Sequence, residues 1–204
     1  MKKILTSVLA ATMMLLGTSA FAQVSVGAGY VNSTSVKNNS KTPGNGFYAG
    51  LEYTVPVSDF FGLSAGVNYE FVKTNNFSFG SASQPLKEQF INVPVRLNLG
   101  FNMADAARLF VFGGPTFSYA ISGKESVERG SSKVDLLDIY KDWNYNRFDV
   151  MVGGGVGLDL MEKIRLTVGY DLGMFNKYPK GSDGSEPAGK YNRNRLHAGV
   201  AFLF

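Results

Sequence analysis

The sequence predicts an all-β fold, an eight-stranded antiparallel up-and-down transmembrane β-barrel. Apolar residues alternate with small or polar residues along eight stretches, which indicates strands with two unlike faces. The connections between these stretches are alternately long and short, as in a meander of hairpins. Glycine recurs on the face opposite the apolar one, and side chains must be small inside a narrow barrel.

The chain opens with a predicted secretory signal peptide over residues 1–22. Two lysines precede an apolar run over 4–16, and small residues lead to an A-x-A cleavage pattern that ends at Ala22. The apolar run is too short for an uncleaved membrane anchor. We therefore expect export, cleavage after Ala22, and one mature barrel domain over 23–204.

Composition excludes several classes of protein. Loss of the two signal-peptide lysines lowers the Lys plus Arg count from 20 to 18, against 16 acidic residues, so the mature chain is nearly neutral. It has no long basic run, so nucleic acid is not an expected partner. Without cysteine it has no disulfides. No mature stretch reaches the roughly 18 apolar residues of a membrane helix.

Eight predicted strands follow the signal peptide, each near the length that crosses a bilayer at a tilt. The alternation is clear over 62–73, where Leu63 and Val67 lie on one face and Ser64 and Gly66 lie on the other. The predicted strands are 24–32, 47–55, 62–73, 89–100, 108–121, 148–160, 164–175 and 193–204.

The connections are of two kinds. The long ones are rich in Asn, Ser, Gly, Lys and Pro, which is the chemistry of exposed loops. In outer-membrane barrels the short turns face the periplasm and the long loops face outward, so both termini are expected on the periplasmic side. The predicted short turns are 56–61, 101–107 and 161–163, and the predicted long loops are 33–46, 74–88, 122–147 and 176–192.

The apolar face is predicted to meet lipid. In a soluble sandwich the opposite face would meet water and carry Lys, Thr, Gln and Glu, whereas here it carries glycine. A lipocalin-like or sandwich fold is the alternative. Aromatic residues near the strand ends also favour a lipid–water boundary. We therefore expect the bacterial outer membrane as the location, with its lipid and lipopolysaccharide as partners.

Charged side chains are predicted to point into the barrel, where they must pair or stay hydrated. If 161–163 is a three-residue turn, Asp159 lies opposite Arg165. Asp171 and Arg195 lie at similar heights on neighbouring strands.

Glu52, Glu70 and Arg96 are expected to form another cluster. Two interpretations of the interior stay open: an ion path or gate, and a salt-bridged plug, which eight strands favour. A large diffusion pore needs about sixteen strands. The predicted interior charge cluster contains Glu52, Glu70, Arg96, Asp159, Arg165, Asp171, Arg195 and His197.

The residues do not indicate an enzyme. Small outer-membrane barrels that act on lipid A need a Ser–His arrangement. The one histidine, His197, is predicted to point inward, because it alternates with the apolar residues of its strand. One histidine without cysteine makes no transition-metal site, and no cofactor is expected. Asp135, Asp138 and Asp142 share a loop but lack the glycine and terminal glutamate of a calcium loop, so we expect a solvated acidic face.

The longest predicted loop, 122–147, is the candidate binding region. It carries apolar and aromatic residues, and such residues at a surface suggest a partner. The candidate contacts are Leu137, Tyr140 and Trp143. The alternative is that these residues pack on one another or cap the barrel mouth. The predicted function is a structural or surface-binding role towards an extracellular ligand of unknown identity, and the alternative is a narrow channel for ions or small solutes.

Several segments together resemble the small outer-membrane β-barrel family known as the porin family, or PorT-like proteins. The resemblance implies the barrel fold and the outer-membrane location. Phe204 resembles the terminal aromatic signal by which the barrel-assembly machinery recognises such chains. The family also places a proline in its fourth strand, where Pro94 stands, and we expect a β-bulge there. The segments that carry the resemblance are 90–97, 109–115, 147–157, 168–173 and 192–196.

Overall fold

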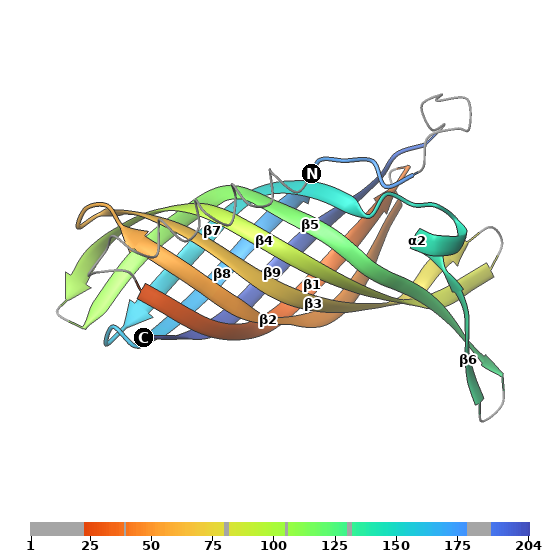
Figure 1. Ribbon diagram of the computed structural model, residues 1–204, viewed down its shortest axis with the longest axis horizontal. Helices are drawn as coiled ribbons and strands as arrows, with labels where there is room; N and C mark the ends of the chain where they lie inside the picture. The colour runs from red at the N-terminus through yellow and green to blue at the C-terminus, as the bar shows by residue number, and fades with distance from the viewer. Residues whose placement is uncertain (1–22, 39, 80–81, 105, 130–131, 179–188) are drawn as a thin grey trace, which may run out of the picture.

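The computed structural model describes residues 23–38, 40–79, 82–104, 106–129, 132–178 and 189–204. The predicted signal peptide lies outside these residues. The elements, shown in Figure 1, are β1 (Gln23–Lys37), β2 (Ser40–Pro56), β3 (Phe61–Phe79), β4 (Ala82–Ala104), β5 (Ala107–Arg129), β6 (Ser132–Asp138), α2 (Ile139–Asp142), β7 (Phe148–Leu160), β8 (Ile164–Gly173) and β9 (Tyr191–Leu203).

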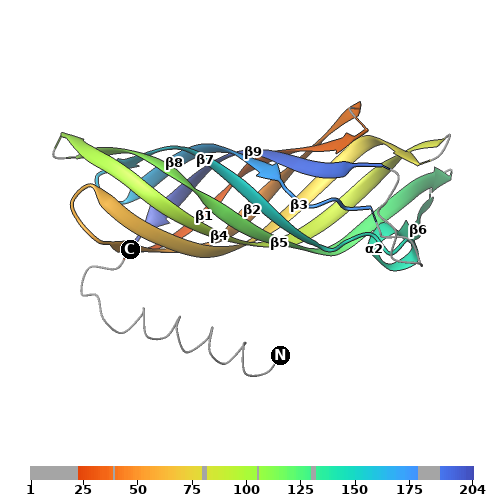
Figure 2. The ribbon, with the colours of Figure 1, turned by 90° about the horizontal axis from the view of Figure 1, so that it is seen from above.

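Eight of the strands close into a barrel. Each pairs antiparallel with its neighbour in the order β4-β3-β2-β1-β9-β8-β7-β5, and pairing between β4 and β5 closes the ring. β6 is an extra strand beside the outer part of β5. Seen from above, the strands run obliquely around one long cylinder (Figure 2). The predicted eight-stranded up-and-down barrel is confirmed.

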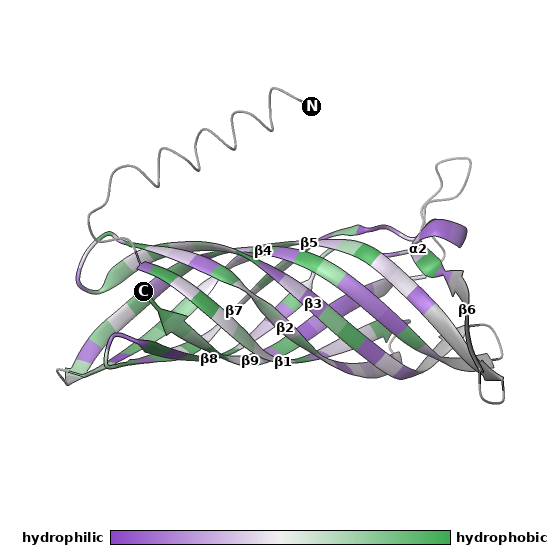
Figure 3. Cartoon of the chain, turned by 60° about the horizontal axis from the view of Figure 1, so that its bottom comes forward, coloured by the Kyte–Doolittle hydropathy of each residue, from purple (hydrophilic) through white to green (hydrophobic). Residues whose placement is uncertain are grey.

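Burial alternates along the strands as in a membrane barrel, with apolar side chains exposed and polar side chains buried. On β8, Ile164, Leu166 and Val168 are exposed, whereas Arg165 and Asp171 are buried. Apolar and polar positions accordingly alternate along the ribbons in Figure 3. An apolar exterior around a polar interior is the arrangement that lipid requires. No helix of the described residues is long and apolar enough to cross a membrane.

Aromatic side chains mark the end of the apolar exterior on the side of the long connections. Phe47 and Phe71 stack with ring centroids 5.6 Å apart, and Phe148 packs on Phe175. Such rings favour the lipid–water boundary. We call this set the aromatic rim, and it contains Tyr30, Phe47, Phe71, Tyr119 and Phe148.

Three of the four predicted long loops consist largely of strand, so their prediction as irregular loops is wrong. β1 and β2 stay paired to Lys37 and Ser40, around a turn in which Asn38 has φ 44°. β3 and β4 stay paired beyond the aromatic rim as far as 79 and 82. The sequence there no longer alternates regularly between apolar and polar residues, but backbone hydrogen bonds do not need that pattern once the hairpin has its register.

The segment 122–147 contains three elements instead of one loop. β5 continues to Arg129, β6 folds back along it, and the single turn of α2 follows. Asp138 caps that turn, and its Oδ1 accepts a hydrogen bond from the Tyr140 amide at 3.0 Å. The fourth segment, 176–192, is described only over 176–178 and 189–192.

The short turns lie at the opposite end of the barrel. Between β7 and β8, the Lys163 amide donates to the Leu160 carbonyl at 3.0 Å, and Met161 and Glu162 have φ near 53° and 54°. Asp159 lies opposite Arg165 in the resulting register, as predicted from this turn.

The expected bulge at Pro94 is not present. The register of β4 is the same on both sides of Pro94, against β3 and against β5 alike. The β3–β4 pairing is instead interrupted over two positions, because proline has no N–H to donate. The nearest register shift on β4 lies at Gln89 and Phe90.

Glycine lets one large side chain lie across the lumen. Gly29 and Gly199 face each other on β1 and β9. A Cβ on Gly29 would stand 2.6 Å from the Cα of Gly199 and 2.6 Å from the Tyr48 ring, closer than real Cβ contacts. The Tyr48 ring therefore occupies space that only glycine leaves open.

Candidate functional site in the barrel lumen

Five charged side chains form a chain of ion pairs through the middle of the lumen. Glu70 binds Arg193 at 3.0 Å and Arg195 at 2.9 Å. Arg195 also binds Asp171, which in turn binds Arg96 at 2.9 Å. All five side chains are at least 95% buried. We call this set the central network.

Neutral groups supply further hydrogen bonds to the central network. Arg96 donates to the Gly114 carbonyl at 2.6 Å and to Thr116 Oγ1 at 2.8 Å. Asn92 donates to Glu70 at 2.9 Å, and Arg193 donates to Ser118 at 3.0 Å. Buried charges are tolerated when they are paired and hydrogen-bonded in this way.

His197 lies at the edge of the central network. Its Nε2 is 3.5 Å from Asp171 Oδ2, and its ring lies 6.2 Å from the rings of Tyr48 and Phe112. The carboxylate beside it already binds Arg96 and Arg195.

A second cluster lies nearer the short turns. Arg165 holds Asp159 through two hydrogen bonds, Nε–Oδ1 at 2.7 Å and Nη2–Oδ2 at 3.0 Å. Glu52 lies 3.2 Å from Arg165, and Arg108 lies 3.7 Å from Asp159. The expected grouping of Glu52 with Glu70 and Arg96 is therefore wrong, because the stagger of the strands brings Glu52 to Arg165 instead.

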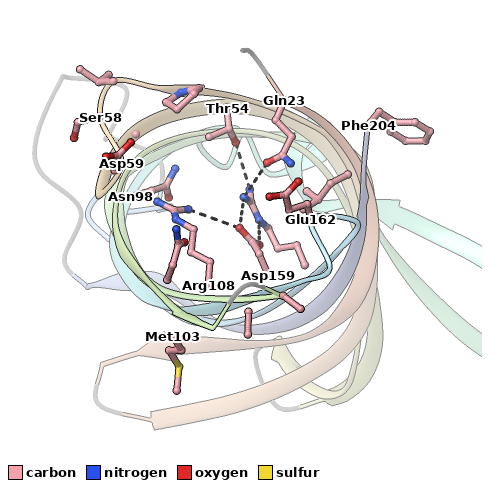
Figure 4. Close-up of a pocket in the computed structure, with 18 residues that line it drawn as sticks. Gln23, Thr54, Ser58, Asp59, Asn98, Met103, Arg108, Asp159, Glu162 and Phe204 are labelled. Atoms are coloured by element: carbon pink, nitrogen blue, oxygen red, sulfur yellow. Dashed lines mark hydrogen bonds and ion pairs between the residues drawn. The ribbon is translucent and has the colours of Figure 1, made fainter.

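The lumen is open at the end with the short turns. A cavity of about 1080 Å³ lies there, which we call the turn-side vestibule. In Figure 4 the side chains of Gln23, Arg108 and Asp159 point into it. Two cavities of about 90 Å³ each lie further in, next to Arg165, and one of them also touches Arg195. Each has room for a few water molecules.

The opposite end of the lumen is covered by a lid. The Tyr140 hydroxyl, on α2, donates to Glu88 at 2.6 Å and accepts from Lys177 Nζ at 2.9 Å. Lys177 also lies 3.5 Å from Glu88 and over the rings of Phe90 and Tyr191. We call Tyr140, Glu88 and Lys177 the lid triad.

The lid triad is almost fully buried, and this changes its acid–base properties. Burial lowers the pKa of Lys177, although Glu88 opposes the shift. Burial raises the pKa of the Tyr140 hydroxyl well above its ordinary value, and the neighbouring Glu88 raises it further. Around the triad lies an apolar cluster with Val31, Val72, Leu86, Phe90, Ala120, Ile139, Tyr145 and Tyr191.

Sequence comparison places this architecture in a family. A family model described as outer membrane protein beta-barrel domain matches residues 16–178. The chain belongs to this outer-membrane β-barrel family. Its location is the bacterial outer membrane, so the short turns face the periplasm and the long hairpins face outward. No curated protein matches the sequence.

Solved structures of other outer-membrane proteins are similar to this chain at low sequence identity. Neisserial surface protein A is 16% identical with a TM-score of 0.50, over 89% of this chain and 97% of that one. The attachment invasion locus protein Ail of Yersinia pestis, bound to the heparin analogue sucrose octasulfate, is 13% identical with a TM-score of 0.48, over 90% and 99%. OprG from Pseudomonas aeruginosa is 12% identical with a TM-score of 0.46, over 92% and 98%.

The three candidate loop contacts have different environments. Tyr140 is 3% exposed, so for this residue the structure favours the alternative of a cap on the barrel mouth over an exposed contact. Trp143 is 45% exposed on the outward side of the same outer-membrane barrel. Leu137 belongs to β6, and its side chain lies outside the described residues.

Sequence reasoning missed four charged members of the lumen: Arg108, Arg193, Glu88 and Lys177. Arg193 has the same parity as Arg195 on β9, so the alternation could have found it. Glu88 and Lys177 lay in segments predicted as loops, where side chains do not alternate between two faces. No sequence signal pointed to their burial.

The acidic residues of 122–147 have local roles where they are described. Asp138 caps α2, and the Asp142 carboxylate accepts a hydrogen bond from the Asp138 amide at 2.8 Å. The side chain of Asp135 lies outside the described residues. Within the described part of the chain, no three His, Cys, Asp or Glu side chains are grouped to hold a metal ion.

The terminal aromatic residue lies at the periplasmic end of the barrel. Phe204 is 71% exposed, and its amide donates to the Val24 carbonyl at 2.8 Å. Its ring packs edge-on against Phe202, with centroids 5.0 Å apart. In Figure 4 the Phe204 side chain points away from the lumen.

Proposed function

We propose that this protein is a non-conducting outer-membrane scaffold that binds a partner outside the cell through its extended hairpins. The observation that carries the proposal is the central network. Arg195 and Glu70 join β9 to β3, and Arg96 and Asp171 join β4 to β8, so ion pairs cross the lumen in two directions. The lid triad adds a second barrier on the outer side of this network.

The hairpins supply the surface for a partner. From Tyr119 in the aromatic rim, β5 continues for ten residues to Arg129, which at about 3.3 Å per residue corresponds to roughly 30 Å. Trp143 is an exposed aromatic residue on the same side. Exposed aromatic residues on a rigid scaffold are typical of binding surfaces.

A narrow channel is the second candidate. The turn-side vestibule and the two small cavities favour it, because together they bring water-sized space from the periplasm to the central network. Conduction would require the central network and the lid to open.

Single-channel recording in a planar bilayer distinguishes the two functions. The refolded protein, checked by its heat-dependent gel shift, is expected to be silent. The matched control combines Glu70→Ser and Arg193→Ser with Tyr140→Ala. It removes two opposite charges from the central network and the side chain that holds the lid triad together, and it should show small steps. Discrete steps from the wild-type protein would contradict the scaffold proposal.

The binding half of the proposal needs its own test. Bacteria that display the protein are compared with bacteria that display a variant in which a Gly-Ser link replaces 125–137. Adhesion to a panel of glycans and extracellular-matrix proteins is measured for both. The deletion should abolish adhesion and leave the heat-dependent gel shift intact. Equal adhesion by the two strains would show that this hairpin does not bind.

A further inference from the structure

Three lysines stand side by side across three neighbouring strands. Lys73 on β3 lies opposite Lys87 on β4, and Lys87 lies opposite Lys124 on β5. Asn45 on β2 continues the same line next to Lys73. With strands about 4.8 Å apart, the first and third lysines are roughly 10 Å apart along this line. We call these four residues the lysine row.

The lysine row faces outward just beyond the aromatic rim. Lys73 and Lys124 are exposed and Lys87 is half-buried. On β3 the row lies two residues past Phe71, and on β2 two residues past Phe47, which is about 7 Å beyond the rim on the extracellular side. The rim marks the lipid–water boundary, so the row lies at the level of the lipid headgroups.

The lysines repel one another in the isolated protein. Like charges directly opposite each other in a sheet are destabilising. Within the part of the chain that the structure describes, Lys73 and Lys87 have no ion pair or hydrogen bond from their side chains. Lys124 has Asp138 opposite it on β6, so the uncompensated charge is greatest on Lys73 and Lys87. An anion between these lysines would remove the repulsion.

Asn45 adds neutral hydrogen-bond donors to the row. Its Oδ1 accepts hydrogen bonds from the Tyr30 hydroxyl at 2.5 Å and from Asn32 Nδ2 at 2.8 Å. This fixes the amide with its two Nδ2–H donors next to Lys73, and they bind no other residue that the structure describes. Phosphate oxygens accept from ammonium and amide donors alike.

We propose that the lysine row binds the phosphate groups of an anionic glycolipid headgroup in the outer leaflet of the outer membrane. Three positive charges on one line suit a headgroup with more than one phosphate. The stacked rings of Phe47 and Phe71 lie directly below the row, where the acyl chains of such a lipid begin. The site is on the barrel wall and does not depend on partner binding by the hairpins.

The test measures lipid binding by the whole refolded protein in nanodiscs of neutral phosphatidylcholine. The probes are bisphosphorylated lipid A, the same lipid A after removal of its phosphates, and inorganic phosphate. The test variant carries Lys73→Gln, Lys87→Gln and Lys124→Gln. The control variant loses the same charge elsewhere, through Lys41→Gln, Lys163→Gln and Lys190→Gln.

The wild-type protein should bind phosphorylated lipid A and discriminate against the dephosphorylated form. The test variant should lose at least about tenfold in affinity, since one basic residue near an anionic lipid surface contributes about fivefold. The control variant and a triple Lys→Arg variant of the row should bind like wild type. If the triple Gln variant does not fold, Lys73→Gln alone should lose about fivefold.

Three outcomes would overturn the proposal. One is equal affinity of the wild-type protein and the folded Gln variants for phosphorylated lipid A. A second is equal binding of the phosphorylated and dephosphorylated lipid. The third is binding of inorganic phosphate as tight as that of lipid A, which would assign the row to a free anion.

Discussion

Arg195 on β9 and Glu70 on β3 form an ion pair across the lumen, with Nη1 2.9 Å from Oε2, although β1 and β2 lie between their strands in the wall. Backbone pairing connects only neighbouring strands. A cross-lumen pair adds a direct link between distant parts of the wall. The barrel is therefore tied together both around its circumference and through its centre.

Neutralising Glu70 should destabilise the barrel strongly. Glu70→Gln leaves Arg193 and Arg195 buried with one carboxylate fewer, and breaking a buried pair in this way costs roughly 3–5 kcal/mol. Urea unfolding in lipid vesicles measures the loss. Glu162→Gln, in an exposed periplasmic turn, is the matched control and should change stability by less than about 0.5 kcal/mol. Similar stabilities for the two variants would show that the network carries little energy.

Removing the Tyr140 hydroxyl should loosen the lid. In Tyr140→Phe the buried Glu88 loses a donor and Lys177 loses an acceptor, which costs roughly 1–3 kcal/mol. The segment around α2 should then open more often, and trypsin should cleave after Lys141 faster in intact cells. Trp143→Phe, at an exposed position of the same segment, serves as the control. An unchanged cleavage rate in Tyr140→Phe would mean that the hydroxyl does not hold the lid.

The stability of the folded protein should also depend on pH in the alkaline range, through Lys37 and two members of the lid triad, Lys177 and Tyr140. Lys37, at the outer end of β1, has its pKa lowered to about 8 by burial, against 10.5 for an ordinary lysine, and burial lowers the pKa of Lys177 as well. Between about pH 8 and 10 the unfolded chain therefore holds more protons than the folded one, and stability rises with pH. Above about pH 10 the raised pKa of Tyr140 reverses the trend, because only the unfolded tyrosine ionises.

The Lys37 contribution can be isolated with two variants. Lys37→Met should flatten the rise of the urea midpoint between pH 8 and 10. Lys41→Met, which removes a lysine from the facing strand, should keep it. A rise of the same size in wild type and Lys37→Met would assign the pH dependence to another group.

Phe204 is expected to act during assembly and not in the finished barrel. Its ring is largely exposed, so Phe204→Ala should change the stability of refolded protein by less than about 0.5 kcal/mol. In cells, however, the variant should accumulate less heat-modifiable barrel in the outer membrane. Phe60→Ala, at another exposed position on the periplasmic side, is the control and should assemble normally. Equal amounts of both variants would remove the assembly role.

The alternation of residues along each strand predicted which way most lumen side chains point, because a strand has only two faces. Arg96, Asp159, Arg165 and Asp171 were all placed inside from the alternation alone, and all are buried. Parity failed beyond the aromatic rim. There the lipid no longer imposes an apolar outer face, so the continuing hairpins lose the regular alternation of apolar and polar residues, and their sequence resembles that of loops.

The sequence by itself determined the barrel, the number of its strands and the direction of side chains within the membrane, because lipid on one side and a narrow lumen on the other impose a local period of two. It also determined the Asp159–Arg165 register, which follows from one short turn. Only the tertiary structure decided which charges meet across the lumen and that Tyr140 closes its mouth. Those contacts depend on the stagger of the strands around the closed barrel, and the sequence of a single strand does not specify that stagger.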